Sequence, residues 1–144
     1  MKKRVQSRLS VNLNKVALLR NARHTNIPNV LDFVDLAIEA GAHGITLHPR
    51  SDERHVRKSD VTETARRMRP LRPRKELNIE GYPDERFLKI VSSIRPEQTT
   101  LVPDSATAFT SDKGWDLTPE QMRILKPVFA KLRKLNTRII LFVD

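Results

Sequence analysis

Polar residues that can transfer protons or bind anions follow the apolar, strand-like segments of this sequence. Asn12 and Asn14 lie in the first such segment, His48 and Arg50 follow the second, and Glu80 closes the third. An imidazole and a carboxylate can accept and return protons, and a guanidinium group binds phosphate through two hydrogen bonds. The same residues also fit structural roles, since Glu80 could pair with an Arg or Lys and the asparagines could form turns.

The charge balance of the chain points to an anionic substrate or a polyanionic partner. The 144 residues carry 27 Lys and Arg against 17 Asp and Glu, a formal net charge of +10, and such a field concentrates phosphates near the surface. Much of the excess lies in residues 66–75 (RRMRPLRPRK), where two prolines favour a solvated helix end and loop over a nucleic-acid-binding patch. With one Trp, one Tyr and no RNA- or DNA-binding motif, a nucleic acid is not the expected partner.

Composition excludes several classes of site. Without cysteine the chain has no disulfide framework, thiolate zinc site or cysteine nucleophile. It has no run of eighteen apolar residues, and no apolar stretch follows the basic start MKKRVQ. We therefore expect neither a membrane span nor a signal peptide, and a cytoplasmic protein.

Strand-like and helix-like segments alternate along the chain. Periodicity predicts five strands, at residues 9–14, 44–48, 76–80, 99–102 and 137–143. Between them it predicts four helices, at residues 30–40, 59–68, 85–94 and 118–135. A long polar loop is expected at residues 103–116.

This alternation predicts an α/β fold with a parallel sheet, because each right-handed crossover between parallel strands needs an intervening helix. After the first strand the sequence reads NLNK instead of a glycine-rich phosphate-binding signature, so a nucleotide-binding fold has little support. Polar residues at the ends of consecutive strands favour a (β/α) barrel, which gathers its active site at the carboxyl ends of its strands. An open doubly wound sheet would concentrate ligand contacts at one switch point.

Four stretches of the sequence resemble a known enzyme family. Residues 11–23 (VNLNKVALLRNAR) are similar to the first strand and loop of pyridoxine 5′-phosphate synthase, and residues 41–55 (GAHGITLHPRSDERH) to its second. Residues 77–83 (LNIEGYP), and residues 100–104 with 110–115, are similar to its third and fourth strand ends. The resemblance runs from Leu9 to Asp144.

The resemblance implies a parallel (β/α)8 TIM-barrel fold, present here as a partial barrel of about four βα units plus a fifth strand. Residues 1–144 would be the N-terminal portion of a single barrel domain, with residues 1–8 as a basic tail. It also implies a reaction that joins 1-deoxy-D-xylulose 5-phosphate to 3-amino-2-oxopropyl phosphate, giving pyridoxine 5′-phosphate, phosphate and water. No metal or organic cofactor is implied.

The resemblance further assigns roles to individual side chains. The implied proton acceptors are His48 and Glu80. The implied contacts to the deoxyxylulose phosphate are Arg50, His55 and Thr110, and those to the amino ketone phosphate are Asn12 and Arg23. The pair that contacts the sugar phosphate is Asn14 and Lys15. Many members of the family have Asp-His at this pair, so the chain departs from the common pattern there.

The family's barrel has eight strands, and its proton-donor histidine and glycine-rich phosphate loops belong to strands six to eight. Because this chain stops at Asp144, we expect it to be inactive by itself and to form a homo-oligomer that covers its sheet edges. The alternative is a catalytically inactive basic half-barrel that associates with itself or with nucleic acid. The retention of His48, Glu80, Arg50 and Thr110 argues against that alternative.

Overall fold

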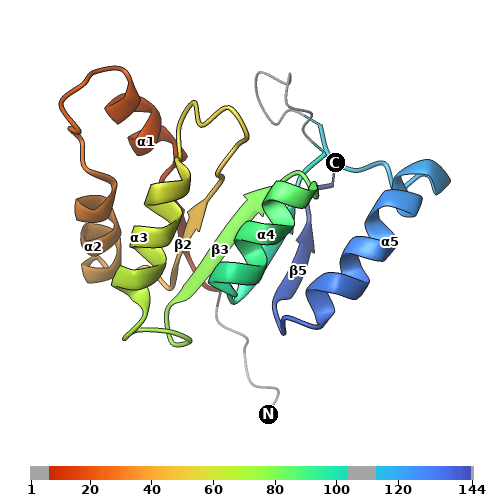
Figure 1. The fold of residues 1–144 in the computed structure, drawn as a ribbon. Coiled ribbons are helices and arrows are strands. Elements are labelled where there is room, and N and C mark those ends of the chain that lie inside the picture. The colour runs from red at the N-terminus through yellow and green to blue at the C-terminus, as the bar shows by residue number, and fades with distance from the viewer. Residues whose placement is uncertain (1–6, 104–112, 144) are drawn as a thin grey trace, which may run out of the picture.

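Strands and helices alternate along residues 7–103 and 113–143, the part of the chain that the computed structural model describes. The strands are β1 (Ser10–Asn12), β2 (Gly44–Leu47), β3 (Glu76–Gly81), β4 (Gln98–Leu101) and β5 (Arg138–Leu141). The helices are α1 (Asn14–Asn21), α2 (Val30–Glu39), α3 (Lys58–Met68), α4 (Glu85–Ile94) and α5 (Pro119–Arg133). Figure 1 shows their arrangement.

The strands form one sheet in the order β1-β2-β3-β4-β5, and every neighbouring pair is parallel. When strand order follows chain order, right-handed crossovers place all the connecting helices on the same face of the sheet. Figure 1 shows α3 and α4 in front of β2 and β3, on that face. A doubly wound sheet would reverse its strand order part-way. The predicted parallel α/β sheet is therefore confirmed.

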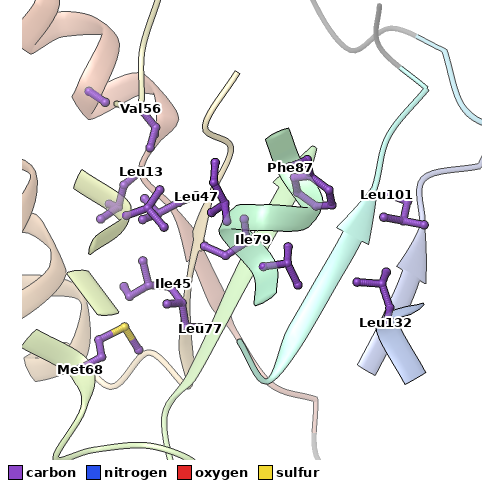
Figure 2. Close-up of a cluster of buried hydrophobic side chains, with 14 of the residues drawn as sticks. Leu13, Ile45, Leu47, Val56, Met68, Leu77, Ile79, Phe87, Leu101 and Leu132 are labelled. Carbon is purple, nitrogen blue, oxygen red and sulfur yellow. The ribbon is translucent and has the colours of Figure 1, made fainter. Parts of the chain in front are cut away.

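The hydrophobic core lies between the sheet and its helices. Side chains from alternate positions of the strands point into it, among them Ile45 and Leu47 of β2 and Ile79 of β3, all fully buried. Met68 of α3 and Phe87 of α4 cover them from the helix side, as Figure 2 shows. Burying this layer stabilises the parallel sheet, because it removes a large apolar surface from water.

The opposite face of the sheet is polar and hydrogen-bonded across four strands. Ser10 Oγ lies 2.8 Å from Thr46 Oγ1, Asn78 Nδ2 donates to Thr46 Oγ1 at 3.2 Å, and Thr100 Oγ1 donates to Asn78 Oδ1 at 3.0 Å. These side chains alternate with the core residues along the same strands. These four side chains hydrogen-bond to one another, and they hold the strands together next to the strand ends that carry the candidate site.

Side-chain caps set the starts of several helices. The Asn29 side chain accepts a hydrogen bond from Leu31 N at the start of α2, and Asp84 accepts one from Phe87 N at the start of α4. Thr118 accepts one from Gln121 N, and Pro119 occupies the first turn of α5. The predicted start of the last helix at Thr118 is confirmed.

The structure corrects the prediction at the first strand. The strand expected over residues 9–14 ends at Asn12, and a helix that was not predicted, α1, begins at Asn14. Asn12 Oδ1 accepts a hydrogen bond from Asn14 N at 2.8 Å, which turns the chain out of the sheet within two residues. The alternation of residues 9–14 therefore continues past the strand, and no glycine or proline separates strand from helix.

The basic segment at residues 66–75 is the end of α3 followed by turns, as expected. Part of its charge has a structural use. Arg72 Nε donates to both carboxylate oxygens of Glu97, at 2.7 and 2.9 Å, and Lys75 Nζ donates to Ala42 O at 2.6 Å. These contacts pin the α3–β3 connection against the start of β4 and the end of the α2–β2 connection.

Candidate active site

Hydrogen bonds join the carboxyl ends of β1, β2 and β3 into one cluster. Asn12 Nδ2 donates to Glu80 Oε2 at 3.3 Å, and Asn12 Oδ1 accepts from Asn14 N. Asn14 Oδ1 in turn accepts from His48 N at 2.9 Å. The two asparagines do form the turn after β1, as the structural interpretation expected, and they also connect Glu80 to the backbone of His48. The predicted convergence of these residues at one end of the sheet is confirmed.

His48 is a buried imidazole directly after β2. Burial lowers its pKa from 6.5 to about 4, and the neighbouring His55 and Arg50 lower it in the same direction. The His48 and His55 rings make an edge contact with their centroids 5.7 Å apart. At neutral pH the His48 imidazole is therefore uncharged, which is the form that can accept a proton.

Arg50 and His55 place a cation and an imidazole beside His48. Arg50 is buried, with its Nε 3.6 Å from Asp52 Oδ1. His55 is half-buried, and burial together with Arg50 lowers its pKa, with Lys15 acting in the same direction. The cations around these imidazoles favour an anion at this end of the sheet, because an anion would offset the repulsion between the charged groups.

The loop that carries these groups is held by side chains of α1, which donate hydrogen bonds to the loop's carbonyl oxygens. The sequence did not suggest these contacts. Asn21 Nδ2 donates to the carbonyl oxygens of Glu53, Arg54 and His55 at 3.3, 3.0 and 2.8 Å. Arg20 Nη2 also donates to His55 O, at 3.1 Å. The side chain of His55 is thereby left to face the site.

A buried ion pair links the same part of α1 to α3. Arg20 Nη1 contacts Asp60 Oδ1, and the two side chains are only 3% and 8% exposed. Asp60 Oδ2 accepts from Arg57 N at 2.7 Å and so caps the start of α3. The sequence alone gives no sign of this pair, because its two residues lie forty positions apart.

The remaining predicted site residues lie at or beyond the margin of the cluster. Lys15 is exposed on the first turn of α1, near enough to His55 to affect its pKa. Arg23 is exposed just past the end of α1, and within the described residues no hydrogen bond or ion pair joins its side chain to the cluster. Thr110 lies outside the described residues.

Two further kinds of feature are absent from residues 7–103 and 113–143. That part of the chain contains no group of three or more His, Asp or Glu side chains placed to hold a metal ion. None of its helices is both long enough and apolar enough to cross a membrane.

Comparison with known sequences decides the family. The family described as pyridoxal phosphate biosynthesis protein PdxJ matches residues 9–144. The chain belongs to the PdxJ family. PdxJ proteins are TIM barrels, and the five consecutive parallel strands with their helices are a partial barrel of that type. The strand-end cluster thus lies where TIM barrels carry their active sites.

Relatives of this PdxJ chain are named pyridoxine 5′-phosphate synthase. One from Mesorhizobium japonicum is 47% identical over 138 residues, which cover 96% of this chain and 56% of the relative. One from Leptospira biflexa is 44% identical over 147 residues, with the same coverage of the two chains. One from Porphyromonas gingivalis is 51% identical over 111 residues, which cover 77% of this chain and 44% of the relative. The chain spans about half the length of these relatives.

Proposed function

We propose that this chain supplies the first strand ends of a pyridoxine 5′-phosphate synthase active site. The proposed reaction condenses 1-deoxy-D-xylulose 5-phosphate with 3-amino-2-oxopropyl phosphate and gives pyridoxine 5′-phosphate, phosphate and water. Its support comes from the names of the relatives and from the acid-base and anion-binding groups at the strand ends. No metal or organic cofactor enters the proposal.

The observation that carries the proposal is the linked pair of proton acceptors. Glu80 and His48 come from neighbouring strands and are connected through Asn12 and Asn14. Closing a pyridine ring requires an amine to condense with a ketone and several protons to leave carbon. A carboxylate and an uncharged imidazole on facing sides of one substrate can accept those protons in turn. His48, with its lowered pKa, is ready to accept a proton before substrate binds.

The proposal extends to the binding of the two phosphorylated substrates. We assign the deoxyxylulose phosphate to Arg50, His55 and Thr110, with Asn14 and Lys15 as further contacts. We assign the amino ketone phosphate to Asn12 and Arg23. Arg50 and His55 support the first assignment because they lie beside His48 and carry donors that suit a phosphate. A bound phosphate would also raise the pKa of His48 and make it a stronger base.

The test replaces the aligned part of the Mesorhizobium japonicum enzyme with this chain, since the chain spans about half of that relative. In this chimera, His48→Gln and Glu80→Gln should each lower kcat by about a hundredfold or more, because each removes a proton acceptor. The assay measures pyridoxine 5′-phosphate formed from the two substrates.

The matched controls are His24→Gln and Glu63→Gln, which change the same residue types at exposed positions outside the hydrogen-bonded cluster. Both controls should keep the chimera's activity. Full activity in His48→Gln and Glu80→Gln would move these residues to structural roles and contradict the proposal.

A further inference from the structure

Arg86, in the first turn of α4, contacts the backbone immediately after His48. Its Nη1 donates to Pro49 O at 2.8 Å, and its Nη2 donates to Arg50 O at 3.0 Å. Glu53 Oε1 lies 3.8 Å from Nη2. Both terminal nitrogens of the guanidinium group thus contact the same short loop, and both of their hydrogen bonds are to its carbonyl oxygens.

These carbonyls belong to a turn that has left the sheet. β2 ends at Leu47, and Arg50 N donates to His48 O at 3.0 Å, so the chain reverses direction between the two site residues. Without ladder hydrogen bonds the turn needs other partners for its polar groups. Arg86 supplies two of them from a neighbouring element.

The backbone at Arg86 is held in place because α4 begins directly after β3, the strand that carries Glu80. β3 ends at Gly81, and Asp84 caps the start of α4 by accepting from Phe87 N at 2.7 Å. Phe87 then packs in the core. A rigid connection therefore runs from Glu80 through the start of α4 to the turn between His48 and Arg50.

We propose that Arg86 is a positioning residue of the synthase reaction, which clamps the turn between His48 and Arg50 so that His48 is held in register with Glu80. This inference rests on the proposed function and deepens it. In this assignment Arg86 acts through the loop, because each of its terminal nitrogens donates to a loop carbonyl oxygen. The planar fork of arginine suits two carbonyls, and a lysine ammonium cannot span them in the same way.

Variants of Arg86 can separate the effect of its positive charge from the effect of its hydrogen bonds to the turn. The charged and titratable groups that act on His48 are His55, Arg50, Asp52 and Arg86, of which Asp52 alone raises its pKa. Arg86→Lys keeps the positive charge and loses the fork, whereas Arg86→Gln loses both. Lys89→Gln is the matched control, because Lys89 lies one turn along on α4, pairs with Glu85 and is exposed.

The first measurement is the NMR titration of the histidine imidazoles in this chain, which has only four histidines. Both Arg86 variants should raise the titration midpoint of His48, because a loosened turn admits water to the buried ring. Arg86→Gln should raise it further, because it also removes a cation. The amide signal of Arg50 should shift in both variants and stay unchanged in Lys89→Gln.

The second measurement is turnover in the chimera described above. Both Arg86 variants should lower kcat by roughly tenfold or more, as expected for a misplaced reacting group, with little change in KM. If Arg86→Lys keeps the parent's His48 titration and kcat, Arg86 contributes only charge and the proposal is wrong. If the parent chimera makes no product, the proposed function fails, while the titration still decides whether Arg86 positions His48.

Discussion

Burial at a single residue, His48, links the candidate site to the pH dependence of folding. The pKa of His48 is about 4 in the folded chain, below its ordinary value of 6.5, chiefly because the ring is buried. Below pH 6.5 the unfolded chain therefore binds a proton that the folded chain excludes until about pH 4. By linkage, stability is lost as the pH falls through this window and is regained as it rises.

The corresponding prediction compares the parent chain with His48→Gln. Between pH 7 and pH 4 the parent should lose up to about 3 kcal/mol more unfolding free energy than the variant, which lacks the titrating ring. Urea denaturation at a series of pH values measures this difference. The exposed His24→Gln variant should follow the parent curve. Parallel curves for the parent and His48→Gln would show that His48 is not held uncharged.

At this scale, sequence reasoning found the residues by their place at strand ends. Asn12, His48, Arg50 and Glu80 lie at or close to the strand ends that the alternation of apolar segments predicted, whereas Asn14, which was expected in the first strand, begins α1. Their catalytic and binding roles stay a prediction. The hydrogen bonds among them could not be predicted, because a pattern of residue types does not specify which side chain of one strand reaches the next.

Among the elements, the strands were easier to predict than the helix α1. Apolar runs and alternation located β2, β3, β4 and β5 within a few residues. α1 was missed because a three-residue strand leads into it without a breaker, and its short apolar pattern resembles a continuation. The contacts that anchor α1 to the loop after β2 join residues more than thirty positions apart, and no local signal marks such a pair.

The Arg20–Asp60 ion pair gives the prediction at this scale. Asp60→Asn leaves the buried Arg20 guanidinium without its carboxylate and weakens the cap of α3, where an amide oxygen replaces a carboxylate oxygen, so it should destabilise the chain by about 3–5 kcal/mol. Urea denaturation measures the loss. The matched control is Arg67→Met, which breaks the exposed pair with Asp35 and should cost less than about 1 kcal/mol.

A double variant distinguishes the ion pair from the cap. Arg20→Met combined with Asp60→Asn should be less destabilised than the sum of the single variants, because the second change removes the stranded charge. Additive losses, or an Asp60→Asn loss as small as that of Arg67→Met, would show that the pair does not hold α1 to α3.

For the whole molecule, strand order follows chain order, and this was predictable because polar residues close several consecutive strands. In the described part of the chain β1 and β5 have a strand on one side only. The exposed backbone groups of such parallel edges can pair with another chain. Ile140 and Phe142 on the β5 side are 38% and 39% exposed, so apolar surface accompanies the open edge.

We therefore expect a polypeptide of these 144 residues to self-associate in solution. At roughly 100 µM, a concentration at which exposed edges and apolar surface favour association, size-exclusion chromatography with light scattering should give a mass above the 16.6 kDa of one chain. Ile140→Lys combined with Phe142→Lys should shift the population toward the monomer, because charged side chains on an edge oppose strand pairing. Leu36→Lys changes an apolar side chain of α2 that is at least as exposed and away from β5, and it should leave the mass unchanged. A monomeric parent would contradict the prediction. If the double variant and Leu36→Lys lower the mass equally, the association comes from general apolar exposure and not from the β5 edge.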